Sequence, residues 1–296
     1  MPDDKVEDFL RFLRFEKRYS KLTLEAYHTD LEQFTTYIQT TYPGTPLLEL
    51  HHSQIRSWLA ELKLNKCSAR TINRKLSSLN SFYKYYFRQG AIQGNPLKAL
   101  HAQKLPERLP VFLKENETQV LLNNTTFDES FVGLTEQLIC ELLYSTGMRR
   151  MELCNLKEKD IEWGLGQIRI LGKGNKERLV PVSQELLTLI TNYINVKHGQ
   201  EKFNAEYLLN TDSGEKVYEM MVYRTVKKYM SEVTTLGKKS PHVLRHTFAT
   251  HLLNNGANIQ AIKDLLGHSS LAATQIYTHN NIEQLKELHK KIHPRG

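Results

Sequence analysis

The 296-residue chain is poor in cysteine and has no long apolar runs, and each shortage excludes a class of protein. Its three cysteines, Cys67, Cys140 and Cys154, form an odd, scattered set without CxxC spacing. This pattern excludes a disulfide scaffold, and we expect reduced, buried thiols in a cytosolic protein. No apolar run approaches the ~18 residues of a membrane helix, which excludes a helical membrane protein. The first residues are acidic and lack an apolar segment, so we expect no signal peptide.

Two patterns that resemble metal and nucleotide sites are incomplete. His242 and His246 have the four-residue spacing of an HExxH zinc site, but Val243 stands where that motif has glutamate, and no carboxylate cluster lies nearby. The Gly172-Lys173-Gly174 sequence does not satisfy GxxxxGKS/T, the loop that cradles nucleotide phosphates. We therefore expect no catalytic metal and no cofactor, and we expect His246 to be a packed, hydrogen-bonded helix residue.

The chain is basic, with a formal net charge of +8, and this charge is concentrated in one segment. Between His51 and Leu105, ten lysines and arginines accompany a single acid, Glu61. Such a basic block is the electrostatic footprint of nucleic-acid binding. It is also what a solvated basic surface looks like, and charge alone does not separate the two readings.

The order of side chains within this segment favours nucleic acid. Apolar residues at helical spacing follow Ser20, Ser53 and Ser68, and we expect each serine to cap a helix. The helix after Ser68 has an apolar face made of Ile72, Leu76, Leu79, Tyr83 and Tyr86. Its opposite face consists of Arg70, Arg74, Ser77, Ser78, Ser81, Lys84 and Arg88. Because these residue types commonly donate to phosphate oxygens, we expect this face to bind DNA through Arg70, Arg74, Ser77, Ser81, Lys84 and Arg88.

A stretch rich in glycine and proline separates this helical module from the rest of the chain. Gly90, Gly94, Pro96, Pro106 and Pro110 fall within one polar segment, a density typical of an interdomain linker. A chain of this length is also long for one hydrophobic core. We therefore predict a helical DNA-binding domain over residues 1–104 and a second domain over residues 105–296.

The second domain is predicted to be mainly α-helical with a small β-sheet insert. Apolar spacing predicts helices over 134–145, 186–194, 222–233 and 241–253, shorter ones around Ala261 and Ala272, and an amphipathic one over about 282–292. Gly147 terminates the first of these helices, and Pro241 suits a first helical turn. Alternating side chains predict a hairpin of strands over 167–171 and 178–182, and a further strand over 207–210.

Two arginines and a histidine are spaced for binding a phosphodiester without a metal. His242 and Arg245 are three residues apart and share a face if the segment is helical. An arginine fork binds two phosphate oxygens at once, and Arg149, directly after the predicted helix end, completes a clamp. Any one of these arginines, taken alone, is better explained as a structural salt bridge. The hypothesis depends on their occurrence together.

Tyr277 and Lys173 supply the remaining chemistry. Tyr277 is the candidate nucleophile because His268 and the histidine–arginine pair lie shortly before it, although most of the fourteen tyrosines must serve packing. Lys173, on the predicted hairpin, can reach a DNA minor groove and donate a proton. Taken alone, however, it is a solvated turn residue, and Lys176 is a near competitor. Together these residues indicate an enzyme that cuts and rejoins DNA.

These segments resemble the tyrosine recombinase, or phage integrase, family, and within it the Xer recombinases of bacteria. The matching segments are residues 146–149, 172–178, 242–253, 265–269 and 274–279. The N-terminal module is similar to the family's SAM-like core-binding domain at Thr23, Tyr27, Asp30, Leu31 and Phe34. The resemblance therefore covers nearly the whole chain.

The resemblance implies an active site and a fold. It places around the scissile phosphate the residues Arg149, Lys173, His242, Arg245 and His268. It makes Tyr277 the nucleophile, Lys173 the general acid for the 5′-hydroxyl, and Glu152 a supporting acid. Arg150 and Met151 depart from the family's usual small or apolar pair, so two arginines are adjacent. The implied fold is a two-domain, C-shaped clamp on double-stranded DNA that carries a specific recombination site.

Assembly and biological role also follow from the resemblance. Family members act as tetramers on two DNA sites, through a Holliday junction, and the predicted helix over 282–292 suits docking on a neighbouring protomer or folding back on its own domain. We expect a cytoplasmic, nucleoid-associated enzyme of chromosome dimer resolution. A second Xer-type recombinase and a septal DNA translocase are the candidate partners of a homo- or heterotetramer. The alternatives are a mobile-element integrase, a DNA invertase, a type IB topoisomerase-like enzyme and a non-catalytic DNA-binding regulator.

Overall fold

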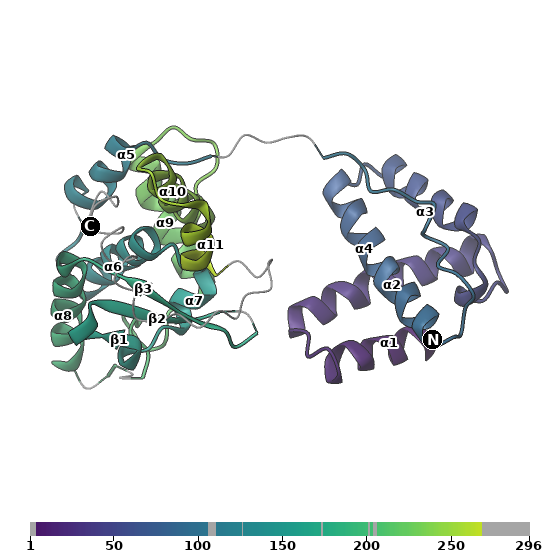
Figure 1. Ribbon diagram of the computed structural model, residues 1–296, viewed down its shortest axis with the longest axis horizontal. Helices are drawn as coiled ribbons and strands as arrows, with labels where there is room; N and C mark the ends of the chain where they lie inside the picture. The colour runs from purple at the N-terminus through teal and green to yellow at the C-terminus, as the bar shows by residue number, and fades with distance from the viewer. Residues whose placement is uncertain are drawn as a thin grey trace. The chain divides into compact units, whose positions relative to one another are not determined.

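The computed structural model describes residues 4–105, 111–125, 127–172, 174–200, 202–203 and 206–267 (Figure 1). The chain falls into two compact units, Met1–Arg108 and Leu109–Gly296. Both are mainly helical, and a small sheet lies in the second, so the predicted fold class is confirmed. None of the helices within these ranges is long and apolar enough to cross a membrane.

The first unit is built from α1 (Asp4–Phe15), α2 (Lys21–Thr41), α3 (His52–Leu64) and α4 (Ala69–Arg88). The predicted caps at Ser20 and Ser68 are confirmed, because each hydroxyl accepts the backbone N–H three residues later. The predicted cap at Ser53 is wrong. The helix begins after His51, whose backbone N–H donates to the Gln54 side chain at 2.8 Å, and this cap starts α3 before Ser53.

The helix α4 packs against the other three helices of this unit, and aromatic pairs contribute to the shared core. The predicted apolar face of α4 is buried in full. Phe82 of α4 meets Phe9 of α1 edge-on, with ring centroids 5.6 Å apart. Phe34 of α2 packs on Trp58 of α3 at 4.9 Å. Rings of this size bury large apolar areas, so they carry much of the stability of the unit.

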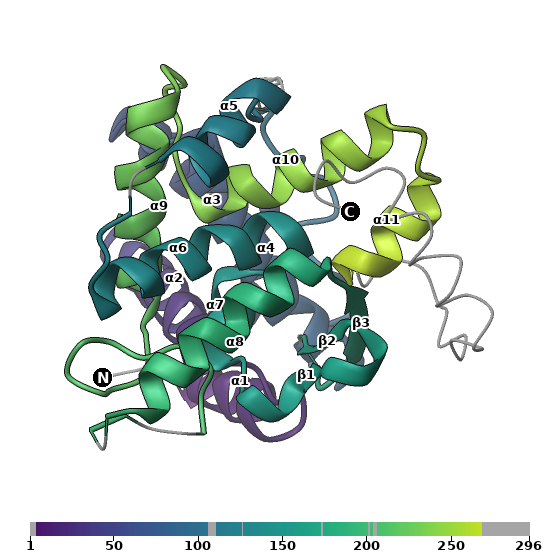
Figure 2. The same cartoon turned by 90° about the vertical axis from the view of Figure 1, so that its left-hand side faces the viewer.

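The second unit is organised around α6 (Phe131–Thr146), which is buried over most of its length. It packs against α8 (Gln184–His198), α9 (Glu219–Val233) and α10 (Pro241–Asn254), as Figure 2 shows. Ser130 caps its start, and it ends at Gly147, whose φ of 58° is left-handed. A Cβ at Gly147 would lie 2.5 Å from the ring of Phe248 in α10. The predicted helix end at Gly147 is confirmed, and both the turn and the packing there require glycine.

Within the described residues this unit also has the shorter helices α5 (Glu115–Gln119), α7 (Arg150–Asn155) and α11 (Ile259–Leu266), the short π-helix η2 (Val120–Asn124), and two 3-10 turns, η3 (Glu158–Asp160) and η4 (Trp163–Leu165). The helices predicted over 186–194, 222–233 and 241–253 are confirmed as α8, α9 and α10, and the one around Ala261 is confirmed as α11. The helices expected around Ala272 and over 282–292 lie outside the described residues.

A three-stranded antiparallel sheet has the order β1 (Ile161–Glu162), β2 (Gln167–Leu171) and β3 (Glu177–Pro181). The predicted hairpin is confirmed, although β3 begins one residue earlier than expected. The two residues of β1 are too few to show alternation, so the sequence did not predict this strand. The strand predicted over 207–210 is wrong, because its two ends make only isolated bridges, to Lys157 and Lys216.

The three thiols differ in their surroundings. Cys140 and Cys154 are buried, and burial raises the pKa of Cys154 to about 11. Cys67 is only partly buried. The expectation of free, buried thiols therefore holds for two of the three cysteines.

Candidate active site

The first turn of α10 carries the predicted histidine–arginine pair. Pro241 occupies the first helical position, where its missing N–H has no helical partner to lose. His242 is exposed, whereas Arg245 has only 8% of its surface accessible. Both residues border one pocket. The helix therefore places the buried guanidinium of Arg245 and the imidazole of the exposed His242 at the same pocket.

Arg245 is held by two backbone carbonyls. Its Nη1 donates to the carbonyl of Gly147 at 2.5 Å, and its Nη2 donates to the carbonyl of Leu266 at 2.6 Å. Burial and the nearby charges of Arg149 and Arg178 lower the pKa of Arg245 to about 10. The side chain is therefore still cationic at neutral pH, and the charge sits in a fixed place.

Arg149 precedes α7 and is fixed by Glu152. Its backbone N–H donates to Glu152 Oε2 at 2.8 Å, and its Nη1 donates to Glu152 Oε1 at 2.7 Å. The neighbouring Arg150 instead pairs with Glu219 of α9. Both arginines border the pocket, but Arg149 is the one joined to the same network as Arg245.

Glu152 is a buried carboxylate shared by two arginines. Arg178 of β3 donates from Nη2 to Glu152 Oε2 at 2.7 Å, and each of these two side chains is 5% exposed. Burial alone would raise the pKa of Glu152, but the hydrogen bond and charge of Arg178 and the hydrogen bonds from Arg149 outweigh it and lower the pKa. Glu152 is therefore ionised at neutral pH.

Arg178 is a member of this network that sequence reasoning missed. Its signal was present in the strand pattern, because Arg178 and Val180 alternate onto the buried face of β3. An arginine that points inward needs a buried acceptor. Which acceptor it meets could not be read from the strand itself.

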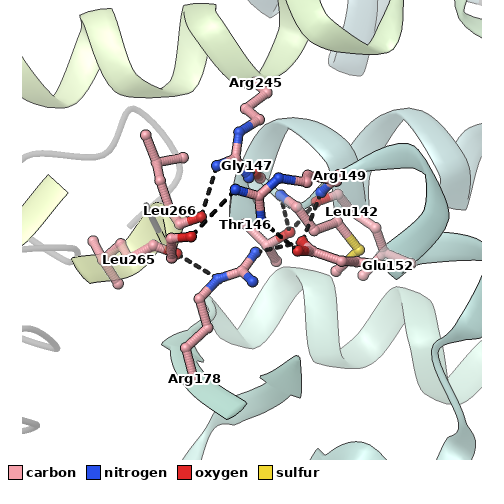
Figure 3. Close-up of polar contacts among 11 residues, drawn as sticks. Leu142, Thr146, Gly147, Arg149, Glu152, Arg178, Arg245, Leu265 and Leu266 are labelled. Carbon is pink, nitrogen blue, oxygen red and sulfur yellow. Dashed lines mark hydrogen bonds and ion pairs between the residues drawn. The ribbon is translucent and has the colours of Figure 1, made fainter. Parts of the chain in front are cut away.

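Three consecutive carbonyls at the end of α11 each accept a hydrogen bond from a different arginine (Figure 3). The acceptors are Leu265, Leu266 and Gly267, at 2.6, 2.6 and 3.2 Å. The donors, in the same order, are Arg178, Arg245 and Arg149. The last carbonyls of a helix lack partners within it and carry partial negative charge, so cationic donors are favoured there. The end of α11 thus anchors both predicted clamp arginines.

A pocket of about 220 Å³ opens beside these arginines. Its lining consists of Met148, Arg149, Arg150, Tyr223, Lys238, Ser240, Pro241, His242 and Arg245. His242 is exposed as a whole residue, but the partial burial of its ring beside the pocket and the charges of Lys238 and Arg245 lower its pKa below the ordinary 6.5. The histidine is therefore mainly neutral at pH 7, and the cations around it suit an anion such as a phosphodiester.

The other predicted catalytic residues, Lys173, His268 and Tyr277, lie outside the described residues. The residues directly before Lys173 and His268 border the network. A Cβ on Gly172, directly before Lys173, would lie 3.4 Å from Glu152 Oε1. Gly267, directly before His268, supplies the carbonyl that Arg149 binds. The base of the hairpin and the end of α11 therefore meet at the same buried carboxylate and arginines.

His246 is packed, but the predicted hydrogen bond is not found among the described residues. Its ring lies edge-on to Phe112 with centroids 6.4 Å apart, and its buried Nε2 has no partner within the described ranges. The bonded histidine of α10 is His251, between the hydroxyl of Tyr144 at 3.0 Å and the carbonyl of Leu113 at 2.9 Å. In the part of the chain that the structure describes, no group of three His, Cys, Asp or Glu residues could hold a metal ion.

The predicted DNA-binding face of α4 is mostly exposed. Exposed members are Arg70, Arg74, Ser77, Lys84 and Arg88. Ser81 is partly buried and shares a hydrogen bond of 3.3 Å with the hydroxyl of Tyr27.

Asp30 of α2 binds two residues of that face, the exposed Arg74 and the buried Ser78. Its buried carboxylate pairs with Arg74 and accepts hydrogen bonds from Lys75 and Ser78, both at 2.9 Å. Ser78 is buried, so its assignment to the outer face of α4 is wrong. A buried carboxylate needs several donors, and helix spacing alone does not reveal such a partner on another helix.

The chain matches one family along most of its length. Residues 111–284 match the phage integrase family, and residues 6–90 match the phage integrase N-terminal SAM-like domain. The chain is 35% identical over 294 residues to tyrosine recombinase XerC of Staphylococcus epidermidis, which covers 99% of this chain and 98% of that protein. It is 33% identical over 297 residues to tyrosine recombinase XerD of Listeria monocytogenes, with 99% and 100% covered.

Solved structures share the fold. XerH site-specific recombinase bound to a palindromic difH substrate, in a post-cleavage complex, is 23% identical with a TM-score of 0.73, over 95% of this chain and 82% of that chain. A lambda integrase dimer bound to a COC′ core site is 18% identical with a TM-score of 0.64, over 90% and 94%. The chain belongs to the phage integrase family of tyrosine recombinases.

Proposed function

We propose that this protein is a tyrosine-type, site-specific DNA recombinase. The observation that carries the proposal is the pair Arg149 and Arg245, held by backbone carbonyls and Glu152 at the edge of one pocket with His242. Each guanidinium has five N–H donors and, within the described residues, uses only some of them, so donors remain for the non-bridging oxygens of a phosphodiester. Family membership along the whole chain supports the same function.

In the proposed cleavage step, the phenolic oxygen of Tyr277 attacks the scissile phosphorus. A phosphorus–oxygen bond to the tyrosine forms, the bond to the 5′-oxygen breaks, and a 3′-phosphotyrosyl intermediate results. Arg149 and Arg245 stabilise the charge that develops on the non-bridging oxygens. Lys173 gives a proton to the departing 5′-oxygen, while His242 and His268 assist removal of the phenolic proton and contact the phosphate.

Rejoining is the same step in reverse with a different hydroxyl. One phosphodiester is exchanged for another, so no nucleotide hydrolysis is needed. When the attacking 5′-hydroxyl comes from a partner duplex, the strands are exchanged and a Holliday junction forms. This exchange requires two DNA sites and four active sites, and a tetramer supplies the four active sites.

The two units have separate roles in this proposal. Residues 1–104 bind DNA through α4, with the contacts made by Arg70, Arg74, Ser77, Ser81, Lys84 and Arg88. Residues 105–296 cleave and rejoin the strands. The exposed basic side chains of α4 and the cationic pocket beside α10 support this division.

The proposed biological role is chromosome dimer resolution at the nucleoid, in the cytoplasm. The identity of 33–35% with curated XerC and XerD proteins over nearly the whole chain supports it. In this role the protein forms a homotetramer, or a heterotetramer with a second Xer-type recombinase, and a septal DNA translocase is a candidate partner. A mobile-element integrase or DNA invertase of the same family is the alternative.

Covalent trapping on DNA tests the proposal. The protein is incubated with sheared genomic DNA of the organism that encodes it, the mixture is denatured, and the protein-linked ends are sequenced. We expect 3′ ends joined to Tyr277 that cluster at one short chromosomal site. Tyr277→Phe should bind the same DNA and yield no covalent product.

Each other outcome has a distinct meaning. Ends at the borders of a mobile element or an invertible promoter would favour the integrase or invertase. Ends without sequence preference would indicate a topoisomerase-like enzyme. Absence of any covalent product from the wild-type protein would contradict the recombinase assignment itself.

A further inference from the structure

Arg178 occupies a position between three parts of the second unit. It lies in β3, it is 5% exposed, and it faces the same buried side of the strand as Val180. Its Nη2 donates to Glu152 of α7 at 2.7 Å, and its Nε donates to the carbonyl of Leu265 in α11 at 2.6 Å. One planar side chain therefore ties β3 to both α7 and α11 (Figure 3).

We infer that Arg178 is a positioning residue of the active site, which holds Glu152 and the end of α11 in the arrangement that presents Arg149 and Arg245 to a phosphate. This inference rests on the proposed function, because it assigns a role within the same cleavage step. Arg178 does not border the pocket and acts through the groups that it holds.

Arg178 sets the net charge around Glu152. Glu152 accepts from Arg149 through both oxygens, and Arg178 shares one of those oxygens. The three arginines and one glutamate of this network leave an excess of two positive charges. Without Arg178 the excess falls to one, and Glu152 neutralises Arg149 alone. The phosphodiester gains negative charge in the transition state, so this loss weakens the stabilisation where it is needed.

Arg178 also holds the backbone at the end of α11. Leu265, Leu266 and Gly267 are consecutive, and their carbonyls hold Arg178, Arg245 and Arg149. Rigid peptide planes connect these carbonyls, so losing the hydrogen bond to the carbonyl of Leu265 changes the orientation of the other two carbonyls. Gly267 has a φ of 62°, and a Cβ there would lie 3.2 Å from Arg178 Cδ, so the side chain packs directly under this turn. His268 is the next residue in the sequence.

This position requires arginine rather than lysine. The two acceptors lie in different elements, and Arg178 reaches them with two different nitrogens of one rigid fork. Lysine has a single nitrogen at the end of a flexible chain. It keeps the charge but cannot hold both acceptors in a fixed geometry. Arg178→Lys therefore separates the role of charge from the role of geometry.

The experiment compares Arg178→Gln and Arg178→Lys with a matched control, Arg169→Gln. Arg169 lies in β2 of the same sheet, is exposed, and pairs with Glu162. The probe is a nicked duplex that carries the sequence recovered by covalent trapping, and the readouts are the single-turnover rate of covalent complex formation and the Kd for the duplex. We expect Arg178→Gln to lower the rate about 100-fold, because the donors that it positions, Arg149 and Arg245, are displaced from the transition state. The Kd should stay within about threefold, because the phosphate contacts elsewhere on the duplex remain.

A second substrate separates positioning from general damage to the fold. It carries a methylphosphonate at the scissile position, which removes one negative oxygen and with it much of the need for the clamp. On this substrate we expect the deficit of Arg178→Gln relative to wild type to shrink below about tenfold, since less charge develops for the arginines to stabilise. Arg178→Lys should lie between Arg178→Gln and wild type on the normal phosphate, and Arg169→Gln should match wild type on both substrates.

Two results would overturn the inference: a rate for Arg178→Gln within threefold of wild type, or equal losses on the two substrates. If Arg178→Gln does not fold, as judged by circular dichroism, the rates of Arg178→Lys on the two substrates are compared instead. The same two results would then overturn the inference. A wild-type protein that forms no covalent complex would instead refute the proposed function. The two failures are therefore distinguishable.

Discussion

Arg245→Lys is the substitution that most directly tests the phosphate clamp. Arg245 donates through Nη1 to the carbonyl of Gly147 and through Nη2 to the carbonyl of Leu266, and its remaining N–H groups are available to a phosphate. Lysine preserves the positive charge. Its one nitrogen, however, cannot serve two carbonyls on different segments and a phosphate in a fixed geometry.

The expected magnitudes follow from what is lost. Losing one preorganised donor to the transition state lowers the cleavage rate about 100- to 1000-fold, or about 2.7–4 kcal/mol. One of the two buried carbonyls also loses its partner, which lowers the free energy of unfolding by about 1–3 kcal/mol. DNA affinity should change less than about tenfold, because the other basic residues still contact the backbone.

The assay measures the single-turnover rate of covalent complex formation, the Kd for the same duplex and the urea unfolding curve. Arg224→Lys is the control, because it is the same substitution at an exposed position of α9. Cleavage by Arg245→Lys at a near-normal rate would refute the reasoning. So would a loss of rate that is matched by an equal loss of DNA affinity.

Three further predictions follow from the same structure. Gly147→Ala should lower the free energy of unfolding by about 2–5 kcal/mol, from a left-handed φ and a clash with Phe248, and urea unfolding that matches wild type would contradict this. Asp30→Ala leaves the buried Lys75 without its carboxylate and should lower the free energy of unfolding by about 3–5 kcal/mol. Adding Lys75→Met should restore part of this loss, whereas additive effects of the two substitutions would argue against the pair. His242 should titrate below pH 6.5 by proton NMR, and Lys238→Met should raise its midpoint. Because the unfolded chain holds this proton at a higher pH, His242 favours unfolding as the pH falls below 6.5.

Local signals in the sequence were enough to predict most elements of the fold. Ser20 and Ser68 cap helices because a hydroxyl at that position accepts an N–H of the first turn, and Gly147 ends α6 because it adopts a positive φ without strain. Ser53 misled because the competing cap, His51 with Gln54, is an unusual pair for that position.

The sequence also predicted that His242, Arg245 and Arg149 lie together, since a helix turn and a helix end present them, and all three border one pocket. It did not predict the contacts that join side chains of different helices and strands. Ser78 was placed on an outer face because helix spacing does not show that Asp30 of another helix accepts its hydrogen bond. Arg178 was passed over for the same reason, since its acceptors Glu152 and Leu265 lie 26 and 87 residues away.

What the sequence determined by itself was therefore local: helix ends, the apolar face of each helix, the hairpin, and the identity of the charged groups. What only the tertiary structure decided was how those charges are held. The end of α11 receives Arg178, Arg245 and Arg149 on three consecutive carbonyls, from segments up to 118 residues away in the chain. Periodicity reports the conformation of a few neighbouring residues, whereas such a network depends on packing that brings distant segments into contact.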